Sequence, residues 1–340
     1  MNLTRFPRVD LAHLPTPIEP MANLSAHVGG GRLYVKRDDC TGLAFGGNKV
    51  RQLEFYLGAA MAQGADTVLI TGAVQSNFVR LTAAAARKLG MDCHIQLEER
   101  VAKADAAYRN SGNVLLDRLL GATLHSYPDG EDEAGADRQL RDIADGLRAA
   151  GRTPYVIPLA PGHPPLGALG YVDAAGEIVA QCADIGLDLD EIVVASGSGH
   201  THAGLLFGLR ALNADIRVTG VCVRRSAALQ RPRIASRCDE IAALLDRESP
   251  VRDSDIHLTD AMLAPGYGRL NQASLDATSL AARTEALMLD PVYTAKTMAA
   301  FLQRARQAEP EQALMVLHTG GTPAVFAYER ELSSKLSKAA

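Results

Sequence analysis

Residues 67–71 (TVLIT), 77–90 (NFVRLTAAAARKLG) and 93–97 (CHIQL) decide the fold class of this 340-residue chain. The first and third segments are short and rich in apolar and β-branched residues, which is typical of buried strands. The alanine-rich segment between them predicts a helix that ends at a glycine. A strand, a helix and a second strand at this spacing predict a right-handed βαβ unit on a parallel sheet.

The same alternation continues on both sides of this unit. Further strands are expected at 33–37, 153–157, 191–195, 218–223 and 313–318, and further helices at 49–61, 113–120, 137–150, 166–181 and 202–212. The Pro/Gly-rich segment 158–165 (PLAPGHPP) is the clearest boundary in the chain and predicts a domain junction. We therefore expect an α/β protein of two layered halves around a cleft.

Composition and charge exclude several classes of partner. The chain has 35 basic and 39 acidic residues, for a net charge of −4, so no basic field for nucleic acid is present. Neither a signal peptide at the N-terminus nor an apolar run long enough to span a membrane is seen, which predicts a cytoplasmic protein. The five cysteines are widely spaced and form no CxxC pair, so we expect reduced thiols.

Lys49 is the first candidate for chemistry. It follows Gly46, Gly47 and Asn48 at the start of the expected helix 49–61. The positive end of a helix dipole favours the uncharged form of an amine, and an uncharged amine can attack a carbonyl. A solvated surface lysine is the common alternative for such a position.

A second candidate site is the segment 196–202 (SGSGHTH), which lies between an expected strand and an expected helix. Glycines there let backbone N–H groups approach an anion, and Ser198 and Thr201 add hydroxyl donors, so the segment predicts a phosphate site. A tight turn that only packs strand against helix, and a dinucleotide site, are the alternatives; the dinucleotide motif lacks its third glycine. His200 and His202 have no nearby carboxylate or thiolate, so no metal site is expected.

A third candidate is the start of the expected helix 77–90. Ser76 and Asn77 are good N-cap residues, and capping is their simplest role. A helix start after a parallel strand also opens onto the edge of the sheet where α/β proteins bind ligands. A lysine for an aldehyde, a cradle for a phosphate and a polar helix start together suggest pyridoxal phosphate as cofactor.

Six ordered motifs support this interpretation: KRDDC at 36–40, GGNK at 46–49, QSN at 75–77, APGYG at 264–268, DPVYT at 290–294 and HTGG at 318–321. With them, residues 4–328 resemble the D-cysteine desulfhydrase and 1-aminocyclopropane-1-carboxylate (ACC) deaminase family. The resemblance implies a tryptophan synthase β-like fold of type II, with two three-layer α/β domains and the active site in the cleft. It further implies a homodimer, a large domain of residues 1–50 and 162–340, and a smaller inserted domain of residues 51–161.

The resemblance also implies a role for each site residue. Lys49 would form the Schiff base with the cofactor, Asn77 would bind its ring hydroxyl, and Ser76 would act in proton transfer or bind the substrate carboxylate. Ser198, Gly199, His200 and Thr201 would hold the phosphate. Tyr267 and Tyr293 would line the substrate side, with Thr294 facing the pyridine nitrogen and Thr319 close to the cofactor.

Thr294 and Thr319 bear on the substrate. In the family that the sequence resembles, ACC deaminases carry glutamate at the position of Thr294 and tend to carry leucine at the position of Thr319. The desulfhydrases carry threonine at the first of these positions. We therefore expect a β-eliminase that converts D-cysteine to pyruvate, ammonia and sulfide. An L-cysteate sulfo-lyase and an ACC deaminase are the close alternatives, and a silent cofactor-binding protein and an NADP oxidoreductase the distant ones. Gly199, His200, Phe78 and the loop 160–165 depart from the usual desulfhydrase sequence.

Overall fold

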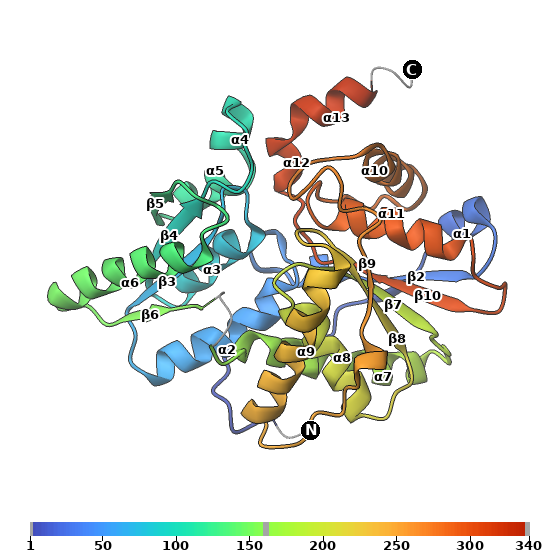
Figure 1. Ribbon diagram of the computed structural model, residues 1–340, viewed down its shortest axis with the longest axis horizontal. Helices are drawn as coiled ribbons and strands as arrows, with labels where there is room; N and C mark the ends of the chain where they lie inside the picture. Colours follow the sequence, from blue (N-terminus) through green and yellow to red (C-terminus); the bar gives the residue numbers. More distant parts are fainter. Residues whose placement is uncertain (1–2, 159–162, 337–340) are drawn as a thin grey trace. The chain divides into compact units, whose positions relative to one another are not determined.

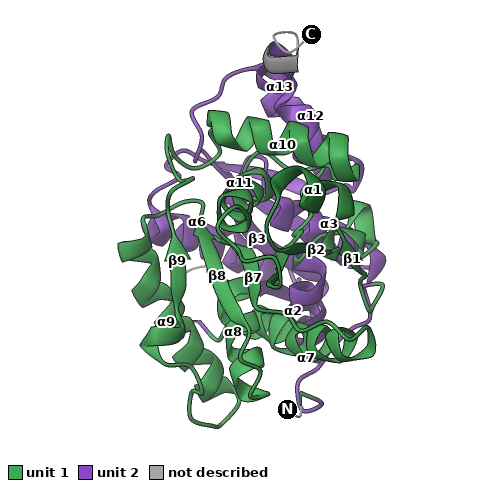
Figure 2. Cartoon of the chain, turned by 90° about the vertical axis from the view of Figure 1, so that its right-hand side faces the viewer, with its two compact units in different colours: residues 1–3, 13–48, 164–322 green, residues 4–12, 49–163, 323–340 purple. Residues whose placement is uncertain are grey.

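The computed structural model describes residues 3–158 and 163–336, and these form two compact units (Figure 2). Unit 1 comprises Met1–Leu3, His13–Asn48 and Pro164–Thr322, and unit 2 comprises Thr4–Ala12, Lys49–His163 and Pro323–Ala340. The domain boundaries inferred from the sequence stay a prediction, and the junction loop 158–165 lies partly outside the described residues. We describe each unit by itself.

Unit 1 is built on a six-stranded sheet (Figure 1). In spatial order its strands are β1 (Ile18–Pro20), β2 (Arg32–Lys36), β10 (Ala313–Leu317), β7 (Glu191–Ser196), β8 (Arg217–Cys222) and β9 (His257–Thr259). All neighbouring strands are parallel except β1, which pairs with β2 in the antiparallel direction. The predicted parallel sheet is therefore confirmed, with one antiparallel edge strand.

Helices cover both faces of this sheet. Successive strand residues point to opposite faces, so Val193 belongs to one apolar cluster while Ile192 and Val194 belong to another. Against one face lie α7 (Leu169–Asp184), α8 (His200–Ala211) and α9 (Ala227–Leu244); against the other lie α1 (Ala22–Val28), α10 (Gln272–Glu285) and α11 (Thr294–Ala305). Unit 1 is thus a three-layer α/β structure.

Unit 2 contains a smaller parallel sheet of four strands, in the order β5 (Thr123–Tyr127), β4 (Asp92–Glu98), β3 (Thr67–Ala73) and β6 (Pro154–Val156). Its helices are α2 (Lys49–Ala62), α3 (Asn77–Lys88), α4 (Ala106–Asn110), α5 (Gly112–Leu119), α6 (Glu133–Ala149), α12 (Ala324–Ala327) and α13 (Glu329–Leu336). The unit β3-α3-β4 is the one predicted from residues 67–97, and its strands pair in register from Thr67 opposite Asp92.

Among the described residues, the sequence patterns missed strands β1, β5 and β9 and helices α1, α4 and α9–α13, and two of these have clear reasons. Strand β5 is an edge strand without a fully buried residue, so it lacks an apolar signal. Helix α9 carries Pro232 in its interior, a residue that usually interrupts a helix. Among the described residues, none of the helices combines the length and the apolar character required to cross a membrane.

Close packing of α7 against α8 yields a stability prediction. A Cβ on Gly204 would lie 2.4 Å from the backbone oxygen of Ala168, whereas a Cβ on Gly176, also inside a helix, would meet nothing within 4 Å. We expect Gly204→Ala to lower the free energy of unfolding by roughly 1–3 kcal/mol. Gly176→Ala should raise it by up to about 1 kcal/mol, because alanine is the better helix former.

Urea unfolding of both variants beside the wild-type chain measures the difference. Equal stability of Gly204→Ala and Gly176→Ala would contradict the packing described for α7 and α8.

Candidate active site

In unit 1, the segment that was predicted to bind phosphate directly follows the carboxyl end of β7. Gly199 is the N-cap residue of α8, with a left-handed φ of 99°. A Cβ at this position would lie 3.2 Å from Cδ1 of Ile234, so the backbone conformation and the space both favour glycine. His200 and Thr201 form the first turn of α8, where the helix dipole attracts anions. Ser198 Oγ lies 3.4 Å from His200 Nδ1.

Asn48 connects this loop to two other loops of unit 1. Its Nδ2 donates to Thr201 Oγ1 at 2.9 Å, and its backbone N–H donates to the backbone oxygen of Thr319 at 3.1 Å. Gly47 and Gly320 form an antiparallel bridge beside it. The structure therefore brings together the segments 46–48, 198–201 and 318–320. Asn48 was absent from the predicted site, although its place next to Lys49 in the GGNK motif was a usable signal.

Two tyrosines of the predicted substrate side meet in unit 1. The hydroxyl oxygens of Tyr267 and Tyr293 lie 2.6 Å apart, and their rings meet edge to face, with centres 6.0 Å apart. Lys296 fixes the loop before Tyr267, because its Nζ donates to the backbone oxygens of Leu263 and Gly266, both at 2.8 Å. Burial lowers the pKa of Lys296 to about 8. Lys296 is a positioning residue that the sequence patterns did not reveal.

Thr294 begins α11, and its hydroxyl is engaged by Asp290. Thr294 Oγ1 donates to Asp290 Oδ1 at 2.8 Å and accepts from the backbone N–H of Asp290 at 2.6 Å. Asp290 is fully buried; desolvation raises the pKa of its carboxyl group, and the N–H and O–H groups that donate to it act in the opposite direction. For Thr294 to donate to a ring nitrogen, its hydroxyl must exchange Asp290 for the new partner.

In unit 2, Lys49 is the first residue of α2 and has a half-buried side chain. Its Nζ lies 5.5 Å from the centre of the Phe78 ring. Among the described residues, no carboxylate forms an ion pair with it, and burial lowers its pKa to about 8. Desolvation without a compensating carboxylate is what keeps an amine partly neutral near pH 7.

Ser76 and Asn77 begin α3, also in unit 2. Ser76 is the N-cap: its Oγ accepts from the backbone N–H groups of Phe78 and Val79 at 3.2 and 3.4 Å. Asn77 Oδ1 accepts from Asn113 Nδ2 at 2.9 Å, and within the described chain its own Nδ2 has no hydrogen-bond partner. The capping role expected for Ser76 is confirmed, while Asn77 offers an amide donor at the carboxyl edge of the sheet.

The residues of both units fit the functional groups of pyridoxal phosphate. The amine of Lys49 suits an aldehyde, the start of α8 suits a phosphate, and the amide nitrogen of Asn77 suits the oxygen on the ring.

His202 lies in the same segment as His200 but is fully buried. Its Nδ1 lies 3.1 Å from Ser196 Oγ, and burial lowers its pKa to about 4. His202 is therefore a neutral imidazole at pH 7.

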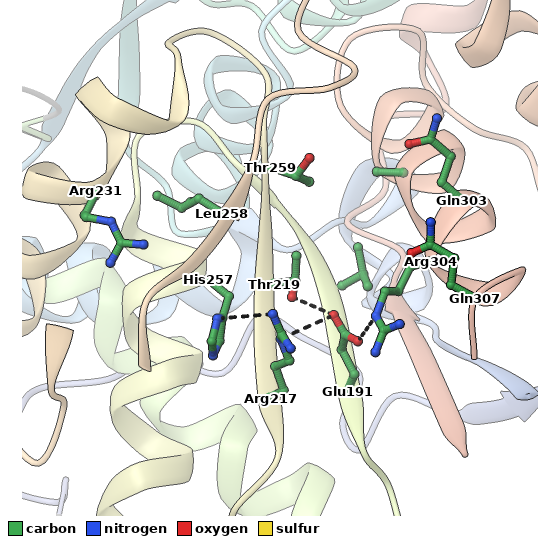
Figure 3. Close-up of a pocket in the computed structure, with 12 residues that line it drawn as sticks. Glu191, Arg217, Thr219, Arg231, His257, Leu258, Thr259, Gln303, Arg304 and Gln307 are labelled. Atoms are coloured by element: carbon green, nitrogen blue, oxygen red, sulfur yellow. Dashed lines mark hydrogen bonds and ion pairs between the residues drawn. The ribbon is translucent and has the colours of Figure 1, made fainter. Parts of the chain in front are cut away.

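A pocket of about 310 Å³ lies elsewhere in unit 1 (Figure 3). It is lined by Glu191 and Arg217, the first residues of β7 and β8, at the end of these strands opposite to the loop 198–201. Glu191 accepts from Arg304 Nε at 2.7 Å, and Arg217 Nε lies 3.9 Å from it. Arg231, on the other side, pairs with Asp253 outside the pocket. Glu191 is thus shared by two arginines, and we interpret this end of the sheet as an ion-pair cluster.

Comparison with known proteins identifies the family of this chain. Residues 9–320 match the model of a family described as "Pyridoxal-phosphate dependent enzyme". The chain is 44% identical to D-cysteine desulfhydrases of Salmonella choleraesuis and Salmonella paratyphi C over 329 residues, which cover 96% of this chain and 98% of theirs.

Solved structures agree with this assignment. A structure described as an ACC deaminase homologue is 40% identical with a TM-score of 0.86, and the match covers 98% of this chain and 97% of that one. An O-ureido-L-serine synthase shares the fold at 18% identity, with a TM-score of 0.68 and 96% of each chain covered. The expected fold class and cofactor are thereby confirmed: the chain belongs to the family of pyridoxal-phosphate dependent enzymes.

Proposed function

We propose that this chain is a carbon–sulfur lyase that converts D-cysteine and water to pyruvate, ammonia and hydrogen sulfide. The relatives named D-cysteine desulfhydrase support the substrate, because they are 44% identical over 96% of the chain. The observation that carries the proposal is the half-buried amine of Lys49, which lacks a carboxylate partner among the described residues and has a pKa lowered to about 8.

Each site residue receives a role in this proposal. Ser198, Gly199, His200 and Thr201 hold the phosphate of the cofactor, and Asn77 donates to the ring oxygen. Thr294 faces the pyridine nitrogen and Thr319 adjoins the cofactor through its loop. When bound, pyridoxal phosphate supplies an aldehyde for the amino group and a conjugated ring that withdraws electrons from Cα. The observed geometry of the loop 198–201 and of Asn77 supports these assignments.

Lys49 is the base of the proposed reaction. At pH 7, a pKa of about 8 leaves about one amine in ten neutral, against about one in 2,500 for an ordinary lysine with a pKa near 10.4. A neutral Nζ accepts the proton from Cα of the substrate, and Ser76 is the alternative proton carrier. The C–S bond then breaks, sulfur leaves with the bonding electron pair, and water later replaces the nitrogen at Cα.

Tyr267 and Tyr293 line the substrate side in this proposal. Their hydroxyl groups lie 2.6 Å apart, so one phenol can donate to the other, and the accepting phenol can direct its own O–H toward a ligand. A phenol in this arrangement is able to protonate departing sulfide.

L-Cysteate and ACC are the alternative substrates. The structural likeness to an ACC deaminase homologue at 40% identity favours the second as a related activity. Thr294 argues against ACC as the substrate, because the deaminases that the sequence resembles carry glutamate at this position.

A cytoplasmic homodimer is also part of the proposal. It rests on the resemblance to the desulfhydrase and deaminase family, in which homodimers are usual. Light scattering of the purified protein should give twice the mass of one chain; the mass of a single chain would contradict it.

Substrate assays on the purified holoenzyme test the proposed reaction. We expect pyruvate, ammonia and sulfide in equal amounts from D-cysteine, at a rate at least about a hundredfold above that of a Lys49→Ala variant, in line with loss of general base catalysis. Pyruvate and sulfite from L-cysteate alone, or 2-oxobutyrate from ACC, would replace the named substrate. Full activity of Lys49→Ala would refute the mechanism.

The pKa of Lys49 is testable without substrate. In the apoprotein, labelling of Lys49 by an amine-reactive acylating reagent should rise with pH to a plateau with a midpoint near 8, because the neutral amine is the reactive form. A blocked lysine amide in the same solution is the reference, with a midpoint near 10.4. Peptide mass spectrometry quantifies both. Coincident midpoints would show that Lys49 is solvated.

A further inference from the structure

Asn113 lies behind Asn77 in unit 2, in the first turn of α5, and its side chain is fully buried. Its Nδ2 donates to the backbone oxygen of Gln75 at 3.0 Å and to Asn77 Oδ1 at 2.9 Å. Its Oδ1 accepts from Arg80 Nε at 3.1 Å. All the polar atoms of this side-chain amide are therefore engaged.

The orientation of this amide is fixed by groups that cannot change their hydrogen-bonding character. Arg80 has donors only, and the backbone carbonyl of Gln75 accepts only. A rotated amide would place its NH₂ group against the guanidinium and its oxygen against the carbonyl. Because the amide is buried, both mismatches would cost the full desolvation penalty. Asn113 therefore presents an N–H, and never an oxygen, to Asn77.

Gln75 fixes the position of Asn113 as well as its orientation. Gln75 Nε2 donates to the backbone oxygens of Tyr108 and Ser111 at 2.6 and 3.0 Å, so its Oε1 must accept from the backbone N–H of Asn113, at 2.9 Å. Gly112 makes this approach possible: its φ is +58°, and a Cβ there would lie 2.7 Å from Gln75 Oε1. This series of hydrogen bonds, each with a fixed donor and acceptor, thus starts at backbone carbonyls and ends at Asn77.

Asn77 has one orientation left. Its Oδ1 is committed to Asn113, so its NH₂ group points away from that partner and, among the described residues, forms no other hydrogen bond. We propose that Asn113, oriented by Arg80 and Gln75, is a positioning residue that makes Asn77 an obligate hydrogen-bond donor toward the ring oxygen of pyridoxal phosphate. This inference rests on the proposed function, in which Asn77 faces that oxygen.

This orientation of Asn77 favours one ionisation state of the ring oxygen of the cofactor. A side chain that offers only N–H groups stabilises the ring oxygen as an acceptor, which is its ionised form. An Asn77 free to rotate would stabilise either form. The buried network therefore determines the charge of the ring oxygen through Asn113, which is fully buried and donates to Asn77.

Asn113→Asp tests the proposal with almost unchanged shape. One carboxylate oxygen can still accept from Arg80, but the other now faces Asn77, which must rotate to donate to it and turn its Oδ1 toward the ring oxygen. We expect the affinity of the apoprotein for pyridoxal phosphate, measured by equilibrium dialysis, to fall about ten- to a hundredfold. The same substitution in an Asn77→Ala background should change the affinity less than about threefold. An equal loss in both backgrounds would mean that Asn113 only stabilises the fold, and would overturn the proposal.

A cofactor analogue separates this inference from the function on which it rests. Wild-type apoprotein should bind 3-deoxypyridoxal phosphate, which lacks the ring oxygen, more weakly than pyridoxal phosphate, and Asn113→Asp should abolish this preference. If the wild-type protein shows no preference, the role proposed for Asn77 itself fails and the inference falls with it. If Asn113→Asp keeps the preference, the positioning role alone fails.

Side-chain hydrogen exchange gives a test that needs no variant. In apoprotein labelled with ¹⁵N-asparagine, the side-chain protons of Asn113 should exchange at least about a hundredfold more slowly than those of Asn77, because only the former are hydrogen-bonded and buried. Equal exchange rates would show that the network described here does not hold Asn113 in place.

Discussion

The two hydrogen bonds of Asn48 are the constraint on which the arrangement of the loops in unit 1 depends. They join the glycine loop before α2 to the start of α8 and to the loop after β10, and the side-chain bond spans 153 residues of sequence. Asn48 and Thr201 are both buried, so leaving either unpaired would cost about 1–3 kcal/mol. Because Lys49 follows Asn48 directly, these bonds fix the residue before Lys49 in the same unit as the loop 198–201.

Hydrogen-bond direction, more than charge, organises the site. Arg80 and the backbone carbonyl of Gln75 fix the amide of Asn113, and Asn113 fixes that of Asn77. In unit 1, Asp290 holds the hydroxyl of Thr294 in the same manner. Groups that can only donate or only accept transmit a unique polarity to amides and hydroxyls, which would otherwise be free to rotate. Such networks stabilise one arrangement because every alternative leaves a buried polar atom unpaired.

Lys49 forms no ion pair among the described residues. Glu191, Arg217 and Arg304 form their cluster at the end of the unit 1 sheet opposite to the loop 198–201. Lys49 has an aromatic neighbour, whereas a carboxylate would raise its pKa. A paired lysine would be a poor base at pH 7, whereas a desolvated one is partly neutral. A lysine without a carboxylate partner among the described residues is thus consistent with the chemistry of the family.

The sequence by itself determined the α/β class, most strands, six of the helices, the cofactor and the family. It did so because apolar periodicity and glycine turns are local signals, and because motifs such as GGNK and DPVYT identify relatives. Among the described residues, it missed three strands and seven helices, including β5 and α9, where the local signal is absent or is interrupted by Pro232. Only the tertiary structure revealed the partners of Asn48, Lys296 and Asn113, since their hydrogen bonds join segments far apart in the chain. Only the tertiary structure could also give the pKa of Lys49, because desolvation depends on atoms that the fold brings close to the amine and not on its neighbours in the sequence.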